Sequence, residues 1–325
     1  MTLRIDVVIP TRDREHLLRR VITPLLDEAV VNRVIVVDDA AHASLRGSAI
    51  AEGSERVEVI ATGGVGPAKA RQAGAEHAQA ELLLFLDDDV VPDTGLAARH
   101  ARHHERSTLL LACGYTPVVP SPGRRLSGEA EVYGRIYEDR CAEYDVDPQI
   151  VLTHLWGGNF SLRREDALRV GLVSERFTQT YHEDRDFGLR CLEAGLTPVF
   201  DRALRAGHEY ERGWPQTAQE SYRRGYSVVL LHELHSDVIG PFDEHQFERN
   251  LPAPLAALVH ESARSGVGVG AVASAGLHVL RWLGARLRLR PLELGAVRLL
   301  RRIEAARGAL DALETLAPCA PVANG

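Results

Sequence analysis

Three consecutive aspartates, Asp87, Asp88 and Asp89, follow the apolar run 82–86. Adjacent carboxylates repel one another, so the cluster indicates that a cation or another positively charged group lies against it. If the strand continues through the cluster, Asp87 and Asp89 face one side and Asp88 turns away. Mg²⁺ is usually held by one or two carboxylates together with substrate phosphates, and Mn²⁺ shares this preference for oxygen ligands. The stretch therefore predicts a metal–diphosphate site.

Other known arrangements also place aspartates after a strand. An acidic first turn of a helix that begins near Asp93 is favoured by the helix dipole, but one aspartate would satisfy that role. The stretch also resembles the D-x-D strand end of haloacid-dehalogenase-type phosphatases. Those chains usually carry the motif near the N-terminus with a lysine after it, whereas the only lysine here, Lys69, precedes it. An EF-hand is excluded because Val91 and Pro92 stand where an oxygen ligand and a glycine are required.

Two later segments carry further candidates. In "HEDRDFGLR", Glu183, Asp184 and Asp186 crowd the first turn of a helix expected at 183–194, which the helix dipole favours. A plain acidic helix start and a carboxylate held as a general base toward an acceptor hydroxyl both fit that pattern. His208, in "RAGHEYERG", is by itself an ordinary core or surface histidine. Beside Asp89 it would complete a site that accepts Mn²⁺.

The first half of the chain contains the elements that must position these residues. We expect strands at 5–9, 34–37, 57–61 and 82–86, with helices at 14–28 and 67–78. Such alternation predicts a parallel sheet that is covered by helices on both faces. Ligands of open sheets bind beyond the carboxyl ends of the strands. The polar and glycine-rich residues at 10–13, 38–39, 62–64 and 87–89 would all gather at that edge.

The second half is less regular and ends in helices. We expect strands at 109–115, 159–162 and 197–200, and helices at 125–144 and 183–194. From about residue 240 the Leu-, Ala- and Arg-rich sequence predicts helices without strands. Leu294, Val297, Leu300 and Ile303 would share one buried helix face. The stretch 317–321 is expected to be a frayed tail.

The composition limits the class of protein. The 325 residues are 45% hydrophobic and 26% charged, as in soluble globular proteins, and the net charge of -7 does not suggest a nucleic-acid partner. Four scattered cysteines, without a C-x-x-C pair or a closely spaced histidine, predict neither a zinc site nor a disulfide framework. The N-terminus enters a strand directly, and the apolar stretch 266–280 is too short to span a membrane. We therefore expect a cytoplasmic protein.

An ordered set of segments gives the most specific signal. The segments are "VVIPTRDR" (7–14), "VIVVDDA" (34–40), "GPAKARQAG" (66–74), "LLLFLDDDVVPD" (82–93), "GGNFSLRREDALRVG" (157–171), "HEDRDFGLRCLEAG" (182–195) and "HEY" (208–210). In order and spacing they resemble the family 2 glycosyltransferases, which are nucleotide-sugar-dependent, inverting enzymes with the GT-A fold. The resemblance implies an α/β, Rossmann-like mixed and mostly parallel sheet flanked by helices. It also implies a catalytic domain at 1–240, with a nucleotide-sugar half at about 1–107 and an acceptor half at about 108–240, before a helical extension at 241–325 with a disordered tail.

The resemblance also implies roles for individual residues. The donor nucleotide would be bound by Pro10, Thr11, Arg12, Asp38, Asp39, Gly66, Arg71, Asp87, Asp88 and Glu183, with Asp38 or Asp39 on the base. The metal, Mg²⁺ or Mn²⁺, would be held by Asp89, Asp87 and His208. Asp184 would take the proton of the acceptor hydroxyl. Close approach of donor or acceptor would be allowed by Gly157 and Gly158, with Trp156 against a sugar ring. A solvated helix position for Arg71 and a core position for Trp156 stay open, and so does the role of Asp88.

The resemblance implies a metal-dependent transfer of one sugar from a nucleoside-diphosphate sugar to a hydroxyl of a small molecule, a glycan or a peptide. Because the chain lacks the Gln-x-x-Arg-Trp motif of processive synthases and lacks membrane spans, we expect a non-processive enzyme. A non-catalytic nucleotide-sugar-binding protein of the same fold and a D-x-D phosphatase are the alternatives. Family members often carry Asp-Asp-Gly-Ser where this chain has Asp-Asp-Ala-Ala at 38–41, so the shape of that loop stays open.

The C-terminal helices fall outside the resemblance. They could cap the core, shape the acceptor site, form a homodimer contact, or make a peripheral membrane contact through the arginines Arg281, Arg286, Arg288 and Arg290.

Overall fold

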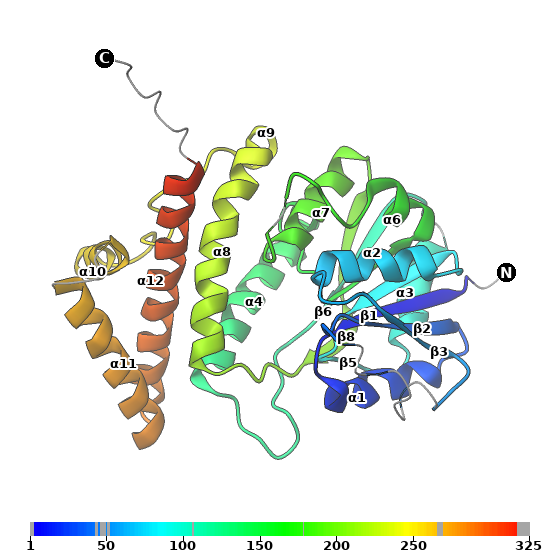
Figure 1. Ribbon diagram of the computed structural model, residues 1–325, viewed down its shortest axis with the longest axis horizontal. Helices are drawn as coiled ribbons and strands as arrows, with labels where there is room; N and C mark the ends of the chain where they lie inside the picture. The colour runs from blue at the N-terminus through cyan, green and yellow to red at the C-terminus, as the bar shows by residue number, and fades with distance from the viewer. Residues whose placement is uncertain are drawn as a thin grey trace. The chain divides into compact units, whose positions relative to one another are not determined.

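The computed structural model describes residues 3–42, 45, 50, 53–105, 107–177, 179–264 and 269–316. The chain forms two compact units (Figure 1). Unit 1 comprises Met1–Leu126 and Tyr133–Glu211, and unit 2 comprises Ser127–Val132 and Arg212–Gly325. Within the described ranges, every helix is too short or too polar to cross a bilayer.

Unit 1 is an α/β unit. Its strands are β1 (Ile5–Thr11), β2 (Val31–Asp38), β3 (Val57–Ala61), β4 (Leu82–Leu86), β5 (Val90–Pro92), β6 (Leu110–Tyr115), β7 (Asn159–Arg163) and β8 (Thr197–His208). Its helices are α1 (Glu15–Leu26), α2 (Pro67–His77), α3 (Leu96–His104), α5 (Ile150–Thr153), α6 (Arg164–Val170) and α7 (Glu183–Glu193). A further helix, α4 (Gly128–Val146), starts within the segment assigned to unit 2 and continues into unit 1 from Tyr133.

The strands form one mixed, mostly parallel sheet in the order β3-β2-β1-β4-β7-β6-β8-β5. β1 pairs in parallel with β2 and β4, and β2 with β3, so the carboxyl ends of these four strands meet at one edge. The register places Thr11 opposite Asp38, and Asp38 opposite Ala61. β7 runs antiparallel between β4 and β6. This arrangement confirms the predicted fold class and the predicted polar edge.

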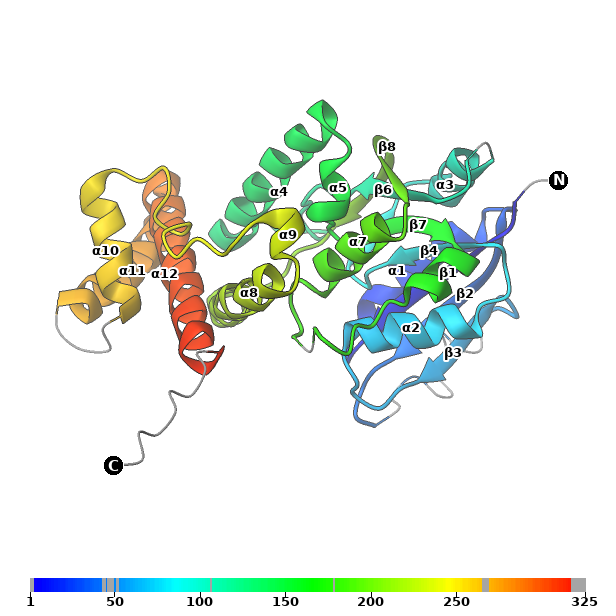
Figure 2. The same cartoon turned by 90° about the horizontal axis from the view of Figure 1, so that it is seen from above.

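Both faces of the sheet are buried. Ile9 and Leu84 pack with residues of α1 and α3 on one face. Their neighbours Val8 and Phe85 pack with α2, α5, α6 and α7 on the other face, and Figure 2 shows α2 and α3 on opposite sides of the strands. Full burial of one such side chain stabilises the fold by about 1.5–3 kcal/mol. The near-continuous apolar strands of the sequence follow from this double burial.

Two strands differ from the prediction. β8 was expected only at 197–200, but it continues to His208, and its second half pairs antiparallel with β5, which was not predicted. The signal for the extension is an alternation in which Leu204 and Ala206 are buried while Arg205 is half-buried. β5 has only three residues, which is too short for its sequence to predict a strand. It forms through its antiparallel pairing with β8.

Unit 2 is helical. Its helices are α8 (Trp214–Leu234), α9 (Ser236–Ile239), α10 (Ala253–Arg264), α11 (Val269–Leu287) and α12 (Arg290–Leu316). The expected buried face of α12 is present, since Leu294, Val297, Leu300 and Ile303 are at most 6% exposed. α12 packs against α8, α10 and α11. The helical unit therefore includes α8 and begins at Arg212, whereas a helical extension was expected from residue 241. The tail at 317–325 lies outside the described residues.

Two of the four arginines expected to face a partner are engaged within unit 2. Arg281 donates to Glu129 at 2.9 Å. Arg290 donates to Glu131 at 2.5 Å and to Glu293 at 2.9 Å. Arg286 and Arg288 are exposed. The segment 127–132 is therefore tied to α11 and α12 by ion pairs, in addition to the contact of Val132 with α12.

Glycines set the closest approach of α8 to α12, which run side by side (Figure 1). A Cβ atom built on Gly308 would lie 2.0 Å from the carbonyl oxygen of Tyr222. On the other helix, a Cβ on Gly225 would lie 1.8 Å from the carbonyl oxygen of Ala305. Because backbone atoms cannot move aside as a flexible side chain does, a larger residue at either glycine must push the helices apart.

We therefore expect Gly308→Ala to lower the free energy of unfolding by about 1–3 kcal/mol, the usual cost of overpacking. Gly295→Ala on the same helix is the matched control, since a Cβ there meets no atom within 4 Å. The control should gain about 0.5–1 kcal/mol, because alanine favours helix over glycine. Urea unfolding followed by circular dichroism measures both. Equal effects of the two substitutions would contradict the proposed close contact.

Candidate functional site

The three aspartates lie in the turn between β4 and β5. The turn is closed by a hydrogen bond from the Val90 amide to the Asp87 carbonyl, 3.1 Å, and the Asp87 amide donates to the Gly158 carbonyl, 3.2 Å. The strand ends at Leu86, so the alternation expected of a continued strand does not apply. Asp88 and Asp89 are each 6% exposed, whereas the side chain of Asp87 is 35% exposed. The turn thus divides the carboxylates into a buried pair and a more open one.

The buried pair shares one arginine that the sequence analysis did not single out. Arg14 Nη1 donates to Asp88 Oδ1 and to Asp89 Oδ2, both at 2.9 Å. The hydroxyl of Thr11 donates to Asp88 Oδ2 at 2.8 Å. Burial raises the pKa of Asp88 to about 6, against the opposing effect of Arg14. Arg14 ends the segment "VVIPTRDR", two positions after the arginine that was selected, and it provides the positive partner that the aspartate cluster required.

His208 lies beside Asp89 because β5 pairs with β8. The ladder places Val90 opposite His208, and the Glu209 amide donates to the Asp89 carbonyl at 2.8 Å. His208 Nε2 then lies 3.5 Å from Asp89 Oδ1. Among the described residues this buried nitrogen has no hydrogen-bond partner. An imidazole nitrogen left without a partner next to a carboxylate is the donor set that Mn²⁺ and similar ions fit, so the residues present suit a metal.

Arg71 connects the open aspartate to the acidic start of α7. Its Nη2 donates to Asp87 Oδ1 at 2.6 Å, and its Nη1 lies 3.6 Å from Glu183 Oε1. Burial lowers the pKa of Arg71, but Asp87, Glu183 and Asp184 raise it overall. Burial and the neighbouring Asp184 raise the pKa of Glu183 to about 8. Arg71 is therefore a buried ion-pair residue, not a solvated helix arginine.

Asp184 faces the glycine pair that precedes β7. The Gly157 amide donates to Asp184 Oδ2 at 3.0 Å, and the Arg185 amide donates to Oδ1 at 2.8 Å. A Cβ on Gly157 would lie 3.0 Å from the Asp184 Cβ, and one on Gly158 would lie 3.1 Å from Asp87 Oδ2. The glycines thus allow carboxylates from the turn after β4 and from α7 to approach the same end of β7.

Asp38 and Asp39 bind the backbone of neighbouring loops. Asp38 is fully buried and accepts hydrogen bonds from the amides of Ala40, 3.1 Å, and Leu45, 3.0 Å. Asp39 accepts four hydrogen bonds from the segment 62–66, including one from the Gly66 amide at 2.9 Å. Gly66 has a φ of 95°, which glycine adopts without strain. Asp39 therefore fixes the loop that leads into α2 and hence the start of the helix that carries Arg71.

The remaining predicted residues lie around this group. Pro10 is half-buried and Arg12 exposed, with an ion pair of 3.9 Å to Asp13. Trp156 is half-buried, and its Nε1 donates to the Tyr133 hydroxyl at 2.8 Å. The ring of Tyr133 meets the His208 ring edge-on, with centroids 5.4 Å apart. Trp156 thus belongs to an aromatic cluster that reaches the candidate metal ligand, and Tyr133 is a contact that the sequence analysis missed.

Direct contacts bring most of the predicted residues into one site. This set comprises Thr11, Arg71, Asp87, Asp88, Asp89, Gly157, Gly158, Glu183, Asp184 and His208. Asp38, Asp39 and Gly66 form a separate hydrogen-bonded group at the ends of β2 and β3. The arrangement combines carboxylates and an imidazole that can hold a divalent cation with the Asp184 carboxylate, which is held by backbone amides and suits proton transfer next to a bound polyanion.

Comparison with known proteins identifies the family. The model of glycosyl transferase family 2 matches residues 6–171, which are 166 of the 325 residues. Validoxylamine A glucosyltransferase of Streptomyces hygroscopicus subsp. limoneus is 28% identical over 235 residues, covering 63% of this chain and 52% of the relative. Pre-mycofactocin glycosyltransferase of Mycobacterium tuberculosis (strain CDC 1551 / Oshkosh) is 27% identical over 248 residues, covering 73% of this chain and 49% of the relative. The chain spans about half the length of these curated relatives.

Solved structures show the same fold. A mannosyltransferase from Pyrobaculum calidifontis in complex with GDP-Man and Mn²⁺ has a TM-score of 0.59 at 18% identity, covering 95% of this chain and 88% of that chain. GalNAc-T7 with UDP, GalNAc and Mn²⁺ has a TM-score of 0.51 at 15% identity, covering 77% of this chain and 52% of that chain. With the family match over half of its length, the chain belongs to glycosyl transferase family 2 and has the GT-A fold.

Proposed function

We propose that this chain is an inverting, metal-dependent glycosyltransferase that moves one sugar from a nucleoside-diphosphate sugar to an acceptor hydroxyl. The observation that carries the proposal is the buried His208 Nε2 beside Asp89, without a hydrogen-bond partner in the described part of the chain. His208 and Asp89 together offer ligand atoms that suit a divalent metal ion. The same site also contains Asp184, next to Gly157. Complexes of structural neighbours with Mn²⁺ and GDP-Man or UDP support the same class of donor.

The proposed metal ligands are Asp89, Asp87 and His208, and the ion is Mg²⁺ or Mn²⁺. When bound, the ion supplies positive charge that stabilises the departing nucleoside diphosphate. Arg71 holds Asp87 by a 2.6 Å hydrogen bond and so orients one of these carboxylates. Asp88 is turned toward Thr11 and Arg14, which favours a role in fixing the turn over direct metal binding.

The proposed donor pocket follows the carboxyl ends of β1 to β4. Pro10, Thr11 and Arg12 lie at the end of β1, and Asp39 holds the 62–66 loop through Gly66. We assign the nucleotide to this edge and the base to the end near Asp38 and Asp39. Because both carboxylates are nearly buried, the groups presented to the base are expected to come mainly from the loops that they hold.

The proposed catalytic base is Asp184. Backbone amides of Gly157 and Arg185 hold its two carboxylate oxygens, so its position is fixed before an acceptor arrives. Burial and the neighbouring Asp184 raise the pKa of the adjacent Glu183 to about 8, which favours Asp184 over Glu183 as the ionised carboxylate of the pair. Attack by the acceptor oxygen forms the new glycosidic bond, breaks the bond to the diphosphate and passes the hydroxyl proton to Asp184. One such displacement inverts the anomeric carbon.

We also propose a non-processive transfer in the cytoplasm. The described cysteines, Cys113, Cys141 and Cys191, are buried free thiols, which supports a reducing compartment. The acceptor is a hydroxyl of a small molecule, a glycan or a peptide. Exposed apolar side chains of α11, including Val272 and Trp282, together with Arg286 and Arg288, support a contact surface on the helical unit.

Asp184→Asn should lower the rate of transfer or donor hydrolysis about 10²–10⁴-fold, because the amide cannot accept the proton. Its carbonyl oxygen can still accept from the Gly157 amide, so donor binding should remain. Release of nucleoside diphosphate from UDP-glucose and GDP-mannose, alongside calorimetry with UDP and GDP, measures the two effects. Asp139→Asn, an exposed aspartate of α4, is the matched control. Unchanged turnover would exclude Asp184 as the base, and turnover absent from the wild type with intact binding would favour a binding protein.

Asp89→Asn and His208→Gln should each weaken Mn²⁺-dependent binding of UDP or GDP by at least about tenfold. Even outer-shell changes at metal sites typically cost 10–100-fold, and these are direct ligands in the proposal. Calorimetric titrations with and without Mn²⁺ measure the effect, and His16→Gln on exposed α1 is the matched control. Metal-independent binding in the wild type would overturn the metal assignment. Steady release of phosphate from simple phosphomonoesters would instead favour the phosphatase.

Arg14→Met should strengthen Mn²⁺ binding about tenfold in the absence of nucleotide. Arg14 Nη1 already contacts Asp88 and Asp89, so its charge competes with an incoming cation for the same carboxylates. Mn²⁺ binding can be followed by electron paramagnetic resonance of the free ion. Arg19→Met, on the exposed side of α1, is the matched control and should change nothing. A loss of Mn²⁺ affinity in Arg14→Met would show that Arg14 supports the site instead of competing for it.

A further inference from the structure

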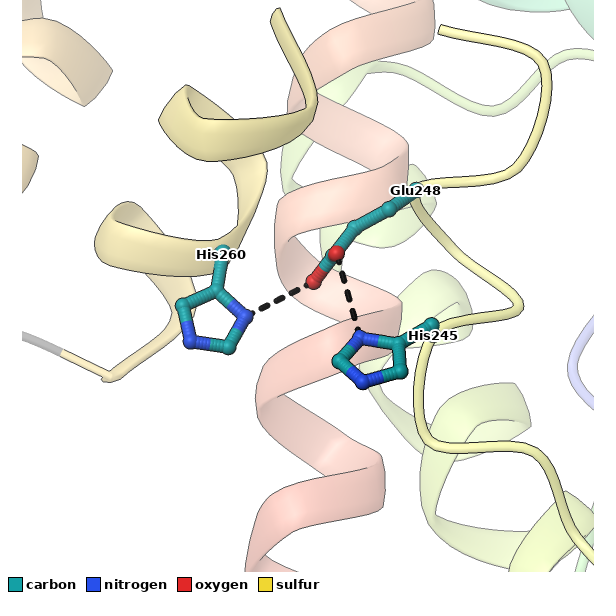
Figure 3. A group of neighbouring side chains, drawn as sticks. All are labelled: His245, Glu248 and His260. Carbon is teal, nitrogen blue, oxygen red and sulfur yellow. Dashed lines mark hydrogen bonds and ion pairs between the residues drawn. The ribbon is translucent and has the colours of Figure 1, made fainter. Parts of the chain in front are cut away.

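We propose that unit 2 contains a separate zinc site, formed by His245, Glu248 and His260 (Figure 3). His260 Nδ1 lies 2.8 Å from Glu248 Oε1, and His245 Nδ1 lies 3.3 Å from Glu248 Oε2. The two imidazole rings are stacked, with an interplanar angle of 23° and centroids 6.3 Å apart. One ligand atom of each residue therefore lies within 4.8 Å of the other two.

The donor set selects the type of metal. Two imidazole nitrogens and one carboxylate oxygen form a recurrent set for Zn²⁺, whereas Mg²⁺ prefers oxygen ligands alone. In the structure each Nδ1 faces a Glu248 oxygen, as it would when carrying a proton. Zinc binding would replace those protons, because a ligand must offer its lone pair. Both nitrogens already face the carboxylate oxygens that would share the ion.

The set needs only a small contraction to bind the ion. Zinc holds nitrogen and oxygen ligands at about 2.0–2.2 Å, so two ligands of a tetrahedral ion lie roughly 3.3–3.6 Å apart. The ligand atoms here are within 4.8 Å of one another. The side chain of His245 is 71% exposed and can rotate inward, while those of Glu248 and His260 are 20% and 34% exposed. The mobile ligand is thus the one at the surface.

The segment that carries Glu248 is anchored on α12. Arg302 Nη1 donates to the carbonyls of Phe247, 3.2 Å, and Arg249, 2.8 Å, on either side of Glu248. Phe247 also packs against a buried cluster formed by α8 and α12. At the other end of the segment, the His245 amide donates to Asp243 Oδ1 at 2.9 Å. A fixed backbone on one side and α10 on the other position the carboxylate between the two histidines.

The three side chains line a small surface hollow. The rest of the wall contains two charged residues, Glu244 and Arg264, and is otherwise apolar, with Phe242, Ala263, Ala306, Ala309, Leu310 and Leu313. Three protein ligands leave a fourth zinc position for water or another ligand. An ion at this site would join the segment before α10 to α10 itself. None of its ligands belongs to the Asp87, Asp89 and His208 group, so this proposal does not depend on the proposed transfer reaction.

The test is zinc titration of the chelator-treated full chain, using competition with a chromogenic chelator. The wild type should bind one more Zn²⁺ than His245→Gln or His260→Gln, or bind it about 100-fold more tightly. Loss of an outer-shell partner alone typically costs 10–100-fold, so loss of a direct ligand should reach that upper range. His208→Gln separates the two sites, because it should leave this zinc in place. His16→Gln controls for a surface histidine.

Two further readouts keep the test sharp. Co²⁺ in place of Zn²⁺ should give the visible absorption of a four-coordinate ion, and His245→Gln should abolish it. Zn²⁺ should also raise the Tm of the wild type but not of His245→Gln, because a ligand that binds only the folded state stabilises it. His245 is exposed, so its substitution does not endanger folding. Absence of zinc binding in the wild type, or binding unchanged by both histidine substitutions, would overturn the proposal.

Discussion

Two arginines make the acidic edge of the sheet compatible with folding. Arg14 lies between Asp88 and Asp89, and Arg71 lies between Asp87 and Glu183. Carboxylates removed from water are costly unless they are paired, so these guanidinium groups offset much of the cost of burying the turn after β4. Burial and the neighbouring Asp184 also raise the pKa of Glu183 to about 8, which opposes a further accumulation of negative charge. The net charge of the site is therefore much lower than its carboxylates alone would give.

The pairing of the strands brings the residues of the site together. The first four strands bring polar residues to one edge, as the sequence pattern requires. The antiparallel addition of β5 to β8 then brings a histidine from the far end of unit 1 to within 3.5 Å of Asp89. β7 contributes no carboxylate, but the two glycines before it leave room for Asp87, from the turn after β4, and for Asp184, from α7. Residues separated by more than a hundred positions in the sequence thus meet through backbone register.

The features that could be predicted from the sequence are those with a regular hydrophobic pattern or an ordered set of motifs. Hydrophobic runs predicted the parallel strands, the buried face of α12 and the acidic strand end, and the ordered segments predicted the family. The sequence could not predict Arg14 as the partner of two aspartates, since an arginine on a helix start carries no signal of its destination. Nor did it predict β5, whose three residues form a strand only by pairing with β8. The hydrogen bonds of Asp38 and Asp39 to backbone amides could not be predicted, because they depend on the shape of the loops. At 40–41 this chain has Ala-Ala where family members often have Gly-Ser, so the shape of that loop could not be inferred from the family. The proximity of His245, Glu248 and His260 was not predicted, because the sequence analysis considered a zinc site only through the spacing of the cysteines.

Asp39 connects the 62–66 loop to the Asp87 turn through a series of contacts. Through four hydrogen bonds it fixes the 62–66 loop, the loop starts α2, and α2 carries the arginine that orients Asp87. These contacts connect the two ends of the proposed donor pocket, the 62–66 loop and the Asp87 turn. If one nucleotide base displaced the loop and another did not, α2 would shift with the loop. The shift would change the hydrogen bond from Arg71 to Asp87. Discrimination between bases would then appear as a change in the position of Asp87, a proposed metal ligand.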